Sequence, residues 1–283
     1  MLLLNASGCL DALTAPGVAG QLDAFVTKTV TPERREGNPP VRIAETEFGM
    51  LNAIGLANPG RERFLAETLP GLRALGKPLW VSVGGFSAAE YADTCAALEN
   101  VTIELNLSCP NVDEAPESAA EIVAACRAAT ALPLYAKLSP AAWDIAEVAR
   151  AVEAAGADGL SLVNTIRGVA LDARLRPTLA RVTGGYSGPA LKPIALAAVY
   201  ACRRATQLPI VGMGGVQNGR DVMELVACGA TNVALGTVLF LDPSAPQRVR
   251  AELSELLDEL GLHNVEEVFG AAHEAVAVYD NYA

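Results

Sequence analysis

The stretch Val101-Thr-Ile-Glu-Leu-Asn-Leu-Ser-Cys-Pro-Asn111 joins a buried strand to a cluster of polar side chains. Its first half is an alternating apolar run, which is typical of a β-strand. Pro110 lacks a backbone donor and prevents a helix from continuing, so the loop after the strand is fixed. Active sites of α/β proteins lie at the carboxyl ends of strands, and this stretch therefore predicts a catalytic loop. Its hydrogen-bonding groups and its one thiol come from Asn106, Ser108, Cys109 and Asn111.

Strand and helix patterns alternate on both sides of this stretch. Short apolar strands are predicted at 2–5, 24–27, 79–83, 102–105, 134–138, 159–163, 210–213 and 232–235. Helices, most of them rich in alanine, are predicted near 88–98, 117–129, 142–155, 190–205, 219–228 and 246–260. Eight strands with helical crossovers are the count of a (β/α)8 TIM barrel, and a doubly wound sheet is the alternative.

An internal repeat supports the barrel. Ala155-Gly-Ala-Asp-Gly-Leu160 leads into Leu162-Val-Asn-Thr165, and Cys228-Gly-Ala-Thr-Asn-Val233 leads into Leu235-Gly-Thr237. In both segments a glycine ends a helix, a short apolar strand follows, and a polar pair stands where the strand exits. The repeated spacing indicates two equivalent units of one barrel.

We therefore expect a single α/β barrel domain over residues 1–283. The irregular segment 28–78 is the longest connection between predicted elements. A connection of this length inside a compact barrel is usually functional, so we expect an extended loop region over the catalytic mouth.

Composition excludes several classes of protein. The net charge is −11 and no Lys/Arg-rich run is present, which argues against nucleic acid as a partner. No stretch of 18 apolar residues could span a membrane, and the first residues lack the pattern of a signal peptide. The six cysteines form no Cys-x-x-Cys motif, which argues against a zinc site, an iron–sulfur cluster or a disulfide scaffold. We expect no metal and a cytoplasmic location.

Two glycine-containing loops follow the last two predicted strands. They are Gly212-Met-Gly-Gly-Val216 and Gly236-Thr237. Barrels bind phosphate with the bare backbone N–H groups of these loops, although tight turns alone would also use glycine. The pattern suits the phosphate of flavin mononucleotide (FMN) and equally that of a sugar phosphate.

Lys28 and Lys137 each end a predicted strand, where a lysine is rarely buried without a partner. Both could be rim lysines with solvated ammonium groups. A fixed ammonium can instead stabilise negative charge on a reduced flavin or a substrate carbonyl, or a lysine can form a Schiff base.

Cys109 is the only cysteine flanked by polar loop residues. The alanine-rich helical patterns place Cys95, Cys126, Cys202 and Cys228 in the core, and Cys9 remains open. Both histidines lie near the C-terminal end, so Cys109 is the candidate general base. Amides present a donor and an acceptor to a pyrimidine-like ring, and four are expected at the mouth: Asn52, Asn106, Asn111 and Asn164.

The order and spacing of these motifs resemble those of the class 1 dihydroorotate dehydrogenases over nearly the whole chain. The matching segments are Asn5–Gly8, Thr27-Lys28, Arg35–Pro39, Asn52–Leu56, Glu104–Asn111, Lys137, Asn164-Thr165, Thr183–Pro189, Gly214-Gly215 and Gly236-Thr237. In that family FMN lies across the barrel mouth and the substrate stacks on it.

The resemblance implies a role for each matching residue. Cys109 would remove a proton from ring carbon 5 while hydride leaves carbon 6 for the flavin, and Lys28 would assist catalysis. FMN would contact Ser7, Lys28, Thr29, Asn106, Lys137, Val163, Gly188, Gly214, Gly215, Gly236 and Thr237. Dihydroorotate would contact Lys28, Asn52, Ala53, Ile54, Gly55, Leu56, Asn106, Asn111, Asn164 and Thr165.

Thr183–Pro189 and Asn164-Thr165 resemble the B subtype. That subtype implies a homodimer within a heterotetramer, whose second subunit carries FAD and a 2Fe-2S cluster and reduces NAD⁺. The alternatives are an A-subtype homodimer that uses fumarate, or a related FMN barrel acting on another dihydropyrimidine. The chain departs from the family in a shorter loop after Cys109 and in Arg167, which stands where a small or apolar residue is common.

Overall fold

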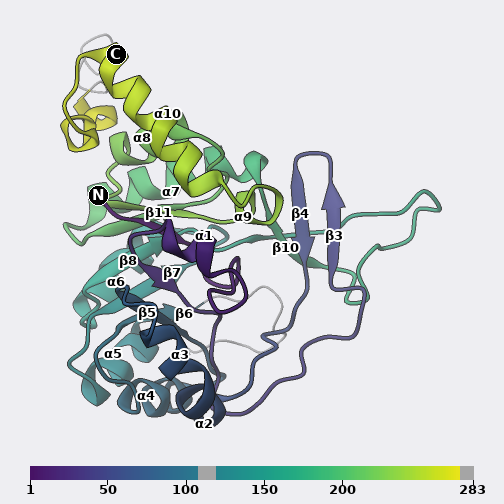
Figure 1. Ribbon diagram of the computed structural model, residues 1–283. Coiled ribbons are helices and arrows are strands. Elements are labelled where there is room, and N and C mark those ends of the chain that lie inside the picture. The colour runs from purple at the N-terminus through teal and green to yellow at the C-terminus, as the bar shows by residue number, and fades with distance from the viewer. Residues whose placement is uncertain (108–118, 275–283) are drawn as a thin grey trace.

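Eight parallel strands form the main sheet of the structure, a computed structural model that describes residues 1–107 and 119–274 (Figure 1). Their order around the sheet is β1-β12-β11-β8-β7-β6-β5-β2. This order follows the chain around a nearly closed (β/α)8 barrel and confirms all eight predicted strands. They are β1 (Leu3–Asn5), β2 (Phe25–Val26), β5 (Leu79–Val83), β6 (Thr102–Asn106), β7 (Leu134–Leu138), β8 (Gly159–Leu162), β11 (Ile210–Met213) and β12 (Asn232–Leu235).

A side chain links the two ends of this sheet. Asn5 on β1 donates from Nδ2 to the carbonyl of Val26 at 2.7 Å, and its Oδ1 accepts from the N–H of Val26 at 2.9 Å. One residue pair further down, the N–H of Asp23 donates to the carbonyl of Leu3 at 2.9 Å. Asn5 thus acts as a substitute for the backbone of a neighbouring strand and joins β1 to β2.

Strand residues alternate between two apolar clusters. Leu3, Val81 and Ile103 belong to the large cluster between strands and helices. The second cluster fills the barrel at the amino ends of the strands, and we call it the barrel floor: Leu4, Val26, Trp80, Tyr135 and Val211. The rings of Trp80 and Tyr135 lie 4.4 Å apart. Gly159 on β8 admits the Tyr135 ring, because a Cβ there would lie 2.3 Å from it.

Helices cover the outside of the barrel, and side-chain caps begin several of them. The Ser87 side chain accepts from the N–H of Glu90 at the start of α4, and Asp144 caps α6 in the same way. The helical elements are α1 (Pro16–Gly20), α2 (Arg61–Arg63), π-helix η1 (Phe64–Thr68), α3 (Leu69–Arg73), α4 (Ala88–Ala96), α5 (Ala119–Ala129), α6 (Ile145–Ala154), η2 (Pro189–Leu191), α7 (Lys192–Ala205), α8 (Gly219–Ala227), α9 (Val238–Leu241), α10 (Ala245–Leu260) and η3 (Val265–Val268).

The sequence repeat corresponds to a repeated structure. Gly156 after α6 and Gly229 after α8 have φ angles of 101° and 109°. At each glycine an arginine stem packs where a Cβ would stand, Arg127 at Gly156 and Arg203 at Gly229. Both arginines donate to loop carbonyls that lead into the next strand. The predicted equivalence of the two units is therefore confirmed, and it includes an arginine that the pattern did not reveal.

A small antiparallel sheet, absent from the prediction, stands beside the barrel. Its order is β3-β4-β10-β9, and its strands are β3 (Ile43–Thr46), β4 (Gly49–Asn52), β9 (Ile166–Gly168) and β10 (Gly184–Ser187). Figure 1 shows the β3–β4 hairpin projecting away from the barrel strands. Residues 28–78 hold this hairpin and the helical run from Arg61 to Arg73, so the segment is more regular than expected, and its place as a loop region over the catalytic mouth stays a prediction.

The described cysteines are all free. Cys95, Cys126 and Cys202 are fully buried in the core as predicted, whereas Cys228 is partly exposed and packs against the edge of the core. Within residues 1–107 and 119–274, no helix has the length and apolar character needed to cross a membrane. The same residues hold no cluster of three or more His, Cys, Asp or Glu side chains able to bind a metal ion.

Candidate active site

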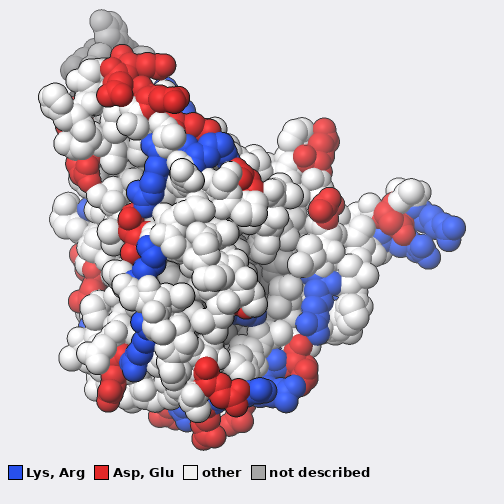
Figure 2. Space-filling view, in the orientation of Figure 1, with Lys and Arg blue, Asp and Glu red and all other residues white. Residues whose placement is uncertain are grey.

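A cavity of about 280 Å³ lies at the carboxyl ends of the barrel strands. Residues after most of the strands line it, and β3 and β4 contribute Ile43, Met50 and Asn52. Figure 2 shows one side of the molecule, with charged side chains of both signs mostly toward its periphery and a largely uncharged central area. Every predicted FMN contact lines this one cavity: Ser7, Lys28, Thr29, Asn106, Lys137, Val163, Gly188, Gly214, Gly215, Gly236 and Thr237.

The loops after β11 and β12 form the glycine-rich end of the cavity. Gly214 and Gly215 have φ angles of 123° and 77°, and a Cβ on Gly215 would lie 2.7 Å from the backbone nitrogen of Lys192. The Thr237 hydroxyl donates to Ser187 Oγ at 2.8 Å. Bare backbone and two hydroxyls at this end fit the phosphate of FMN, because a phosphate needs close N–H and O–H donors.

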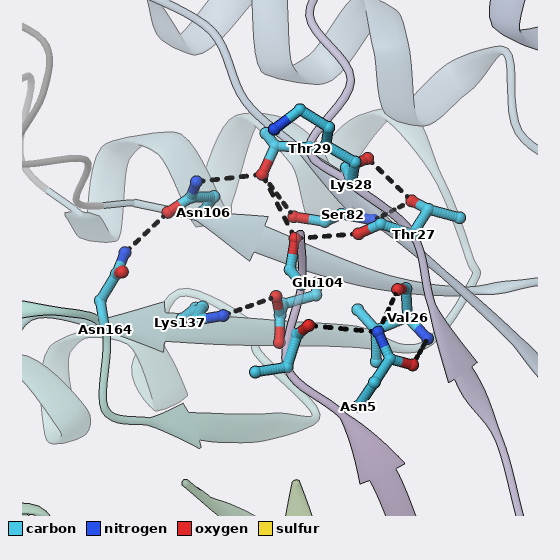
Figure 3. A network of polar contacts seen from close by, with 12 residues as sticks. Asn5, Val26, Thr27, Lys28, Thr29, Ser82, Glu104, Asn106, Lys137 and Asn164 are labelled. Carbon is cyan, nitrogen blue, oxygen red and sulfur yellow. Dashed lines mark hydrogen bonds and ion pairs between the residues drawn. The ribbon is translucent and has the colours of Figure 1, made fainter. Parts of the chain in front are cut away.

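Asn164, Asn106 and Thr29 form a continuous chain of hydrogen bonds along the cavity (Figure 3). Asn164 Nδ2 donates to Asn106 Oδ1 at 2.9 Å, and Asn106 Nδ2 donates to Thr29 Oγ1 at 3.1 Å. Thr29 Oγ1 lies 2.9 Å from Ser82 Oγ inside the barrel. Asn164 Oδ1 also accepts from the N–H of Thr165 at 2.8 Å. Both amides are therefore held in one orientation before any ligand binds.

Lys137 is buried, and its Nζ lies 3.2 Å from Glu104 Oε1 on the neighbouring strand. The two side chains are 7% and 2% exposed. Figure 3 shows the ammonium pointing toward the carboxylate. Lys137 is thus a paired, buried lysine and not a rim lysine, and the sequence analysis missed its partner.

Lys28 lies at the exposed edge of the cavity, two residues after β2. The predicted substrate residues Asn52, Ile54, Gly55, Leu56, Asn106, Asn164 and Thr165 line the cavity with it. Ala53 differs, because it packs in the apolar cluster of Leu51 and Leu179. Its N–H donates to Arg42 and its carbonyl accepts from Asn38.

Three further residues were singled out by the sequence. Cys109 and Asn111 fall outside the described residues, so their predicted roles stay predictions. Arg167 lies on β9 with an exposed side chain and pairs with Gly185 of β10.

Cys9, which the sequence left open, lines the cavity. Burial raises the pKa of its thiol to about 11, although the positive charges of Lys137 and Lys28 oppose this shift. The thiol therefore stays protonated near neutral pH, and Cys9 is a poor base or nucleophile.

The sequence analysis missed other residues of the site. Ile43 and Met50 come from the unpredicted hairpin, Ser187 ends strand β10, and Gln217 lies in the loop after β11. Glu104 could have been found, because an acidic residue inside a buried strand needs a cationic partner.

The dihydroorotate dehydrogenase family model matches residues 2–257. The chain belongs to this family. Three curated relatives are each named dihydroorotate dehydrogenase B (NAD(+)), catalytic subunit. The Geobacillus sp. (strain WCH70) protein is 44% identical, over 88% of this chain and 84% of the relative. The Trichlorobacter lovleyi protein is 43% identical, over 89% of this chain and 86% of the relative. The protein of Listeria monocytogenes serotype 4a is 44% identical, over 88% of this chain and 86% of the relative.

Among solved structures, the dihydroorotate dehydrogenase of Eimeria tenella in complex with ferulenol superposes with a TM-score of 0.78. The superposition covers 96% of this chain and 85% of the Eimeria tenella chain, and the two sequences are 21% identical. This match supports the barrel fold.

Proposed function

We propose that this member of the dihydroorotate dehydrogenase family oxidises dihydroorotate to orotate in pyrimidine biosynthesis with FMN as cofactor. One observation carries the proposal. Apart from Ala53, every described residue that the family resemblance implies for cofactor or substrate lines a single cavity at the carboxyl ends of the strands. The names of the curated relatives support the same reaction.

The chain supplies two kinds of FMN contact. Backbone N–H groups of Gly214, Gly215 and Gly236 would hold the phosphate, and Lys137 with Asn106 would contact the ring. FMN supplies the hydride acceptor for ring carbon 6 of the substrate.

Fixed amides recognise the substrate ring. The hydrogen-bond chain through Asn164 and Asn106 leaves defined donor and acceptor positions for the C=O and N–H groups of a pyrimidine. The loop from Asn52 to Leu56 closes the other side of the cavity. Lys28 adds positive charge at the cavity edge, which suits an anionic substrate and the charge that builds during reaction.

We assign the proton transfer to Cys109, which takes the proton of ring carbon 5 on Sγ. Cys109→Ser should bind FMN normally and lose about 10²- to 10⁴-fold in the rate of flavin reduction near neutral pH. Serine is a weaker acid than cysteine, so a smaller fraction of its side chain is in the deprotonated form that accepts the proton. The rate of flavin reduction should therefore partly recover as pH rises.

Anaerobic stopped-flow mixing of the FMN-loaded protein with dihydroorotate measures this rate. Cys9→Ser serves as the matched control, because the Cys9 thiol has a raised pKa and is no candidate base. An unchanged rate in Cys109→Ser at pH 7 would remove Cys109 from the role of base.

We propose that electrons leave through a partner subunit carrying FAD and a 2Fe-2S cluster, with the catalytic chain as a homodimer in a heterotetramer. The relatives named as catalytic subunits of the NAD(+) form support this arrangement. The cytoplasmic location predicted from cysteine usage stays a prediction.

The isolated chain should therefore oxidise dihydroorotate with artificial dyes and reduce NAD⁺ poorly. Adding the subunit with FAD and the 2Fe-2S cluster should restore NAD⁺ reduction, as measured by the absorbance of the NADH that forms. Efficient turnover with fumarate by the chain alone would favour the A subtype instead.

A further inference from the structure

Glu104 and Lys137 form the most deeply buried ion pair among the described residues. They come from adjacent parallel strands, with Asn106 of β6 in register with Lys137 of β7. The floor residues Trp80 and Tyr135 lie two positions before Ser82 and Lys137 on their strands, so the pair sits directly above an apolar layer.

Stability does not explain this pair. Taking two charges out of water costs several kcal/mol per ion, and buried pairs replaced by apolar residues often leave a protein equally stable. Uncharged side chains fill the rest of the barrel interior at the floor. A pair kept at this depth therefore points to a role at the cavity above it.

The two partners differ in what they face. Lys137 lines the cavity, and Glu104, which is 1% exposed, contacts the ammonium from inside the barrel. Cys9, which also lines the cavity, feels both charges, since Lys137 lowers the pKa of its thiol and Glu104 raises it. The negative charge of Glu104 therefore acts on groups that line the cavity, and its effect opposes that of the Lys137 ammonium.

We propose that Glu104 is a positioning residue that holds the Lys137 ammonium on the cavity wall and offsets part of its charge, and so sets the reduction potential of bound flavin. This inference rests on the proposed use of FMN. An ammonium alone would stabilise the negative charge that the cofactor gains on reduction and would retain the electrons. The carboxylate weakens that effect and keeps the electrons transferable to the next acceptor.

Glu104→Gln tests the proposal, because glutamine keeps the size of the side chain and an oxygen for Lys137 while it removes the charge. The potential of bound flavin, measured by equilibration with a reference dye, should become more positive. The equilibrium should move toward reduced flavin by roughly tenfold, as expected for one charge several ångströms away. Glu255→Gln, an exposed position on α10, makes the same chemical change and should leave the potential as it is.

Glu104→Asp provides a second variant if Glu104→Gln folds poorly. Aspartate keeps the negative charge, but its shorter side chain places that charge farther from Lys137. The reduction potential of bound flavin should therefore also become more positive, by a smaller amount than in Glu104→Gln. A Glu104 variant that binds flavin with the potential of the Glu255→Gln control, or with a lower one, would overturn the proposal. Failure of the unmodified chain to bind FMN would instead overturn the proposed function, and absorbance of the purified protein shows this separately.

Discussion

The barrel interior has two layers that differ in chemistry although the same strands build both. On β5 the floor residue Trp80 is followed two positions later by Ser82, and on β7 Tyr135 is followed by Lys137. Two residues along a strand span about 6.6 Å and return to the same face. One step of the pleat therefore separates the apolar floor from a polar layer, which contains Ser82 and the cavity-lining Lys137.

The two layers depend on different kinds of interaction. The floor is stabilised by area removed from water, so its residues can be exchanged for others of similar volume. The polar layer is stabilised by hydrogen bonds and by the Glu104–Lys137 ion pair, because a buried polar group that loses its partner costs about 1–3 kcal/mol. Substitutions in the floor should therefore change stability most, and substitutions in the polar layer should change function first.

The largest expected effect on stability comes from the floor. Trp80→Ala removes a ring that is 6% exposed and lies tilted against Tyr135, and it should lower the free energy of unfolding by about 3–5 kcal/mol. Urea unfolding of the flavin-free protein measures this loss. Where the variant is still folded, FMN affinity should change little, because Trp80 does not contact the cavity.

Trp143 offers a matched control, since its side chain is fully exposed just before α6. Trp143→Ala should change the free energy of unfolding by no more than about 0.5 kcal/mol. Equal effects of the two substitutions, or a Trp80→Ala protein that loses FMN while remaining as stable as before, would contradict the separation of the layers.

The sequence predicted the barrel because its signals are local. Each barrel strand, such as Leu134–Leu138, is a short apolar run next to a helix with a clear start or end. The antiparallel sheet lacked such signals. Its strands have three or four residues, and Gly184, Gly185 and Gly168 in β9 and β10 resemble turn residues in a linear pattern.

Most of the candidate site was also predictable, because glycines, lysines and amides at strand ends mark it. The Glu104–Lys137 pair was not predicted, since it depends on the register between β6 and β7, and register is a property of the sheet. The fixed orientation of Asn106 likewise depends on Thr29 and Asn164, which are 77 and 58 residues away in the chain.

The smallest expected effect distinguishes two buried serines of the barrel interior. Ser82 and Ser161 are both fully buried on barrel strands. Ser82 Oγ lies 2.9 Å from Thr29 Oγ1, whereas Ser161 Oγ has no hydrogen-bond partner within residues 1–107 and 119–274. Ser82→Ala should lower the free energy of unfolding by about 1 kcal/mol, and Ser161→Ala should leave it unchanged or raise it slightly.

Urea unfolding of both flavin-free variants against the unmodified chain measures the difference, and FMN titration adds a functional readout. Ser82→Ala releases one partner of Thr29, which in turn accepts from Asn106, so this variant should also bind FMN more weakly. Ser161→Ala should bind it as before. Ser161→Ala could instead lose FMN affinity while the stability of the flavin-free protein is unchanged. That result would mean that the Ser161 hydroxyl gains a hydrogen-bond partner only when FMN is bound. The polar layer would then extend to β8, where Ser161 is in register with Lys137.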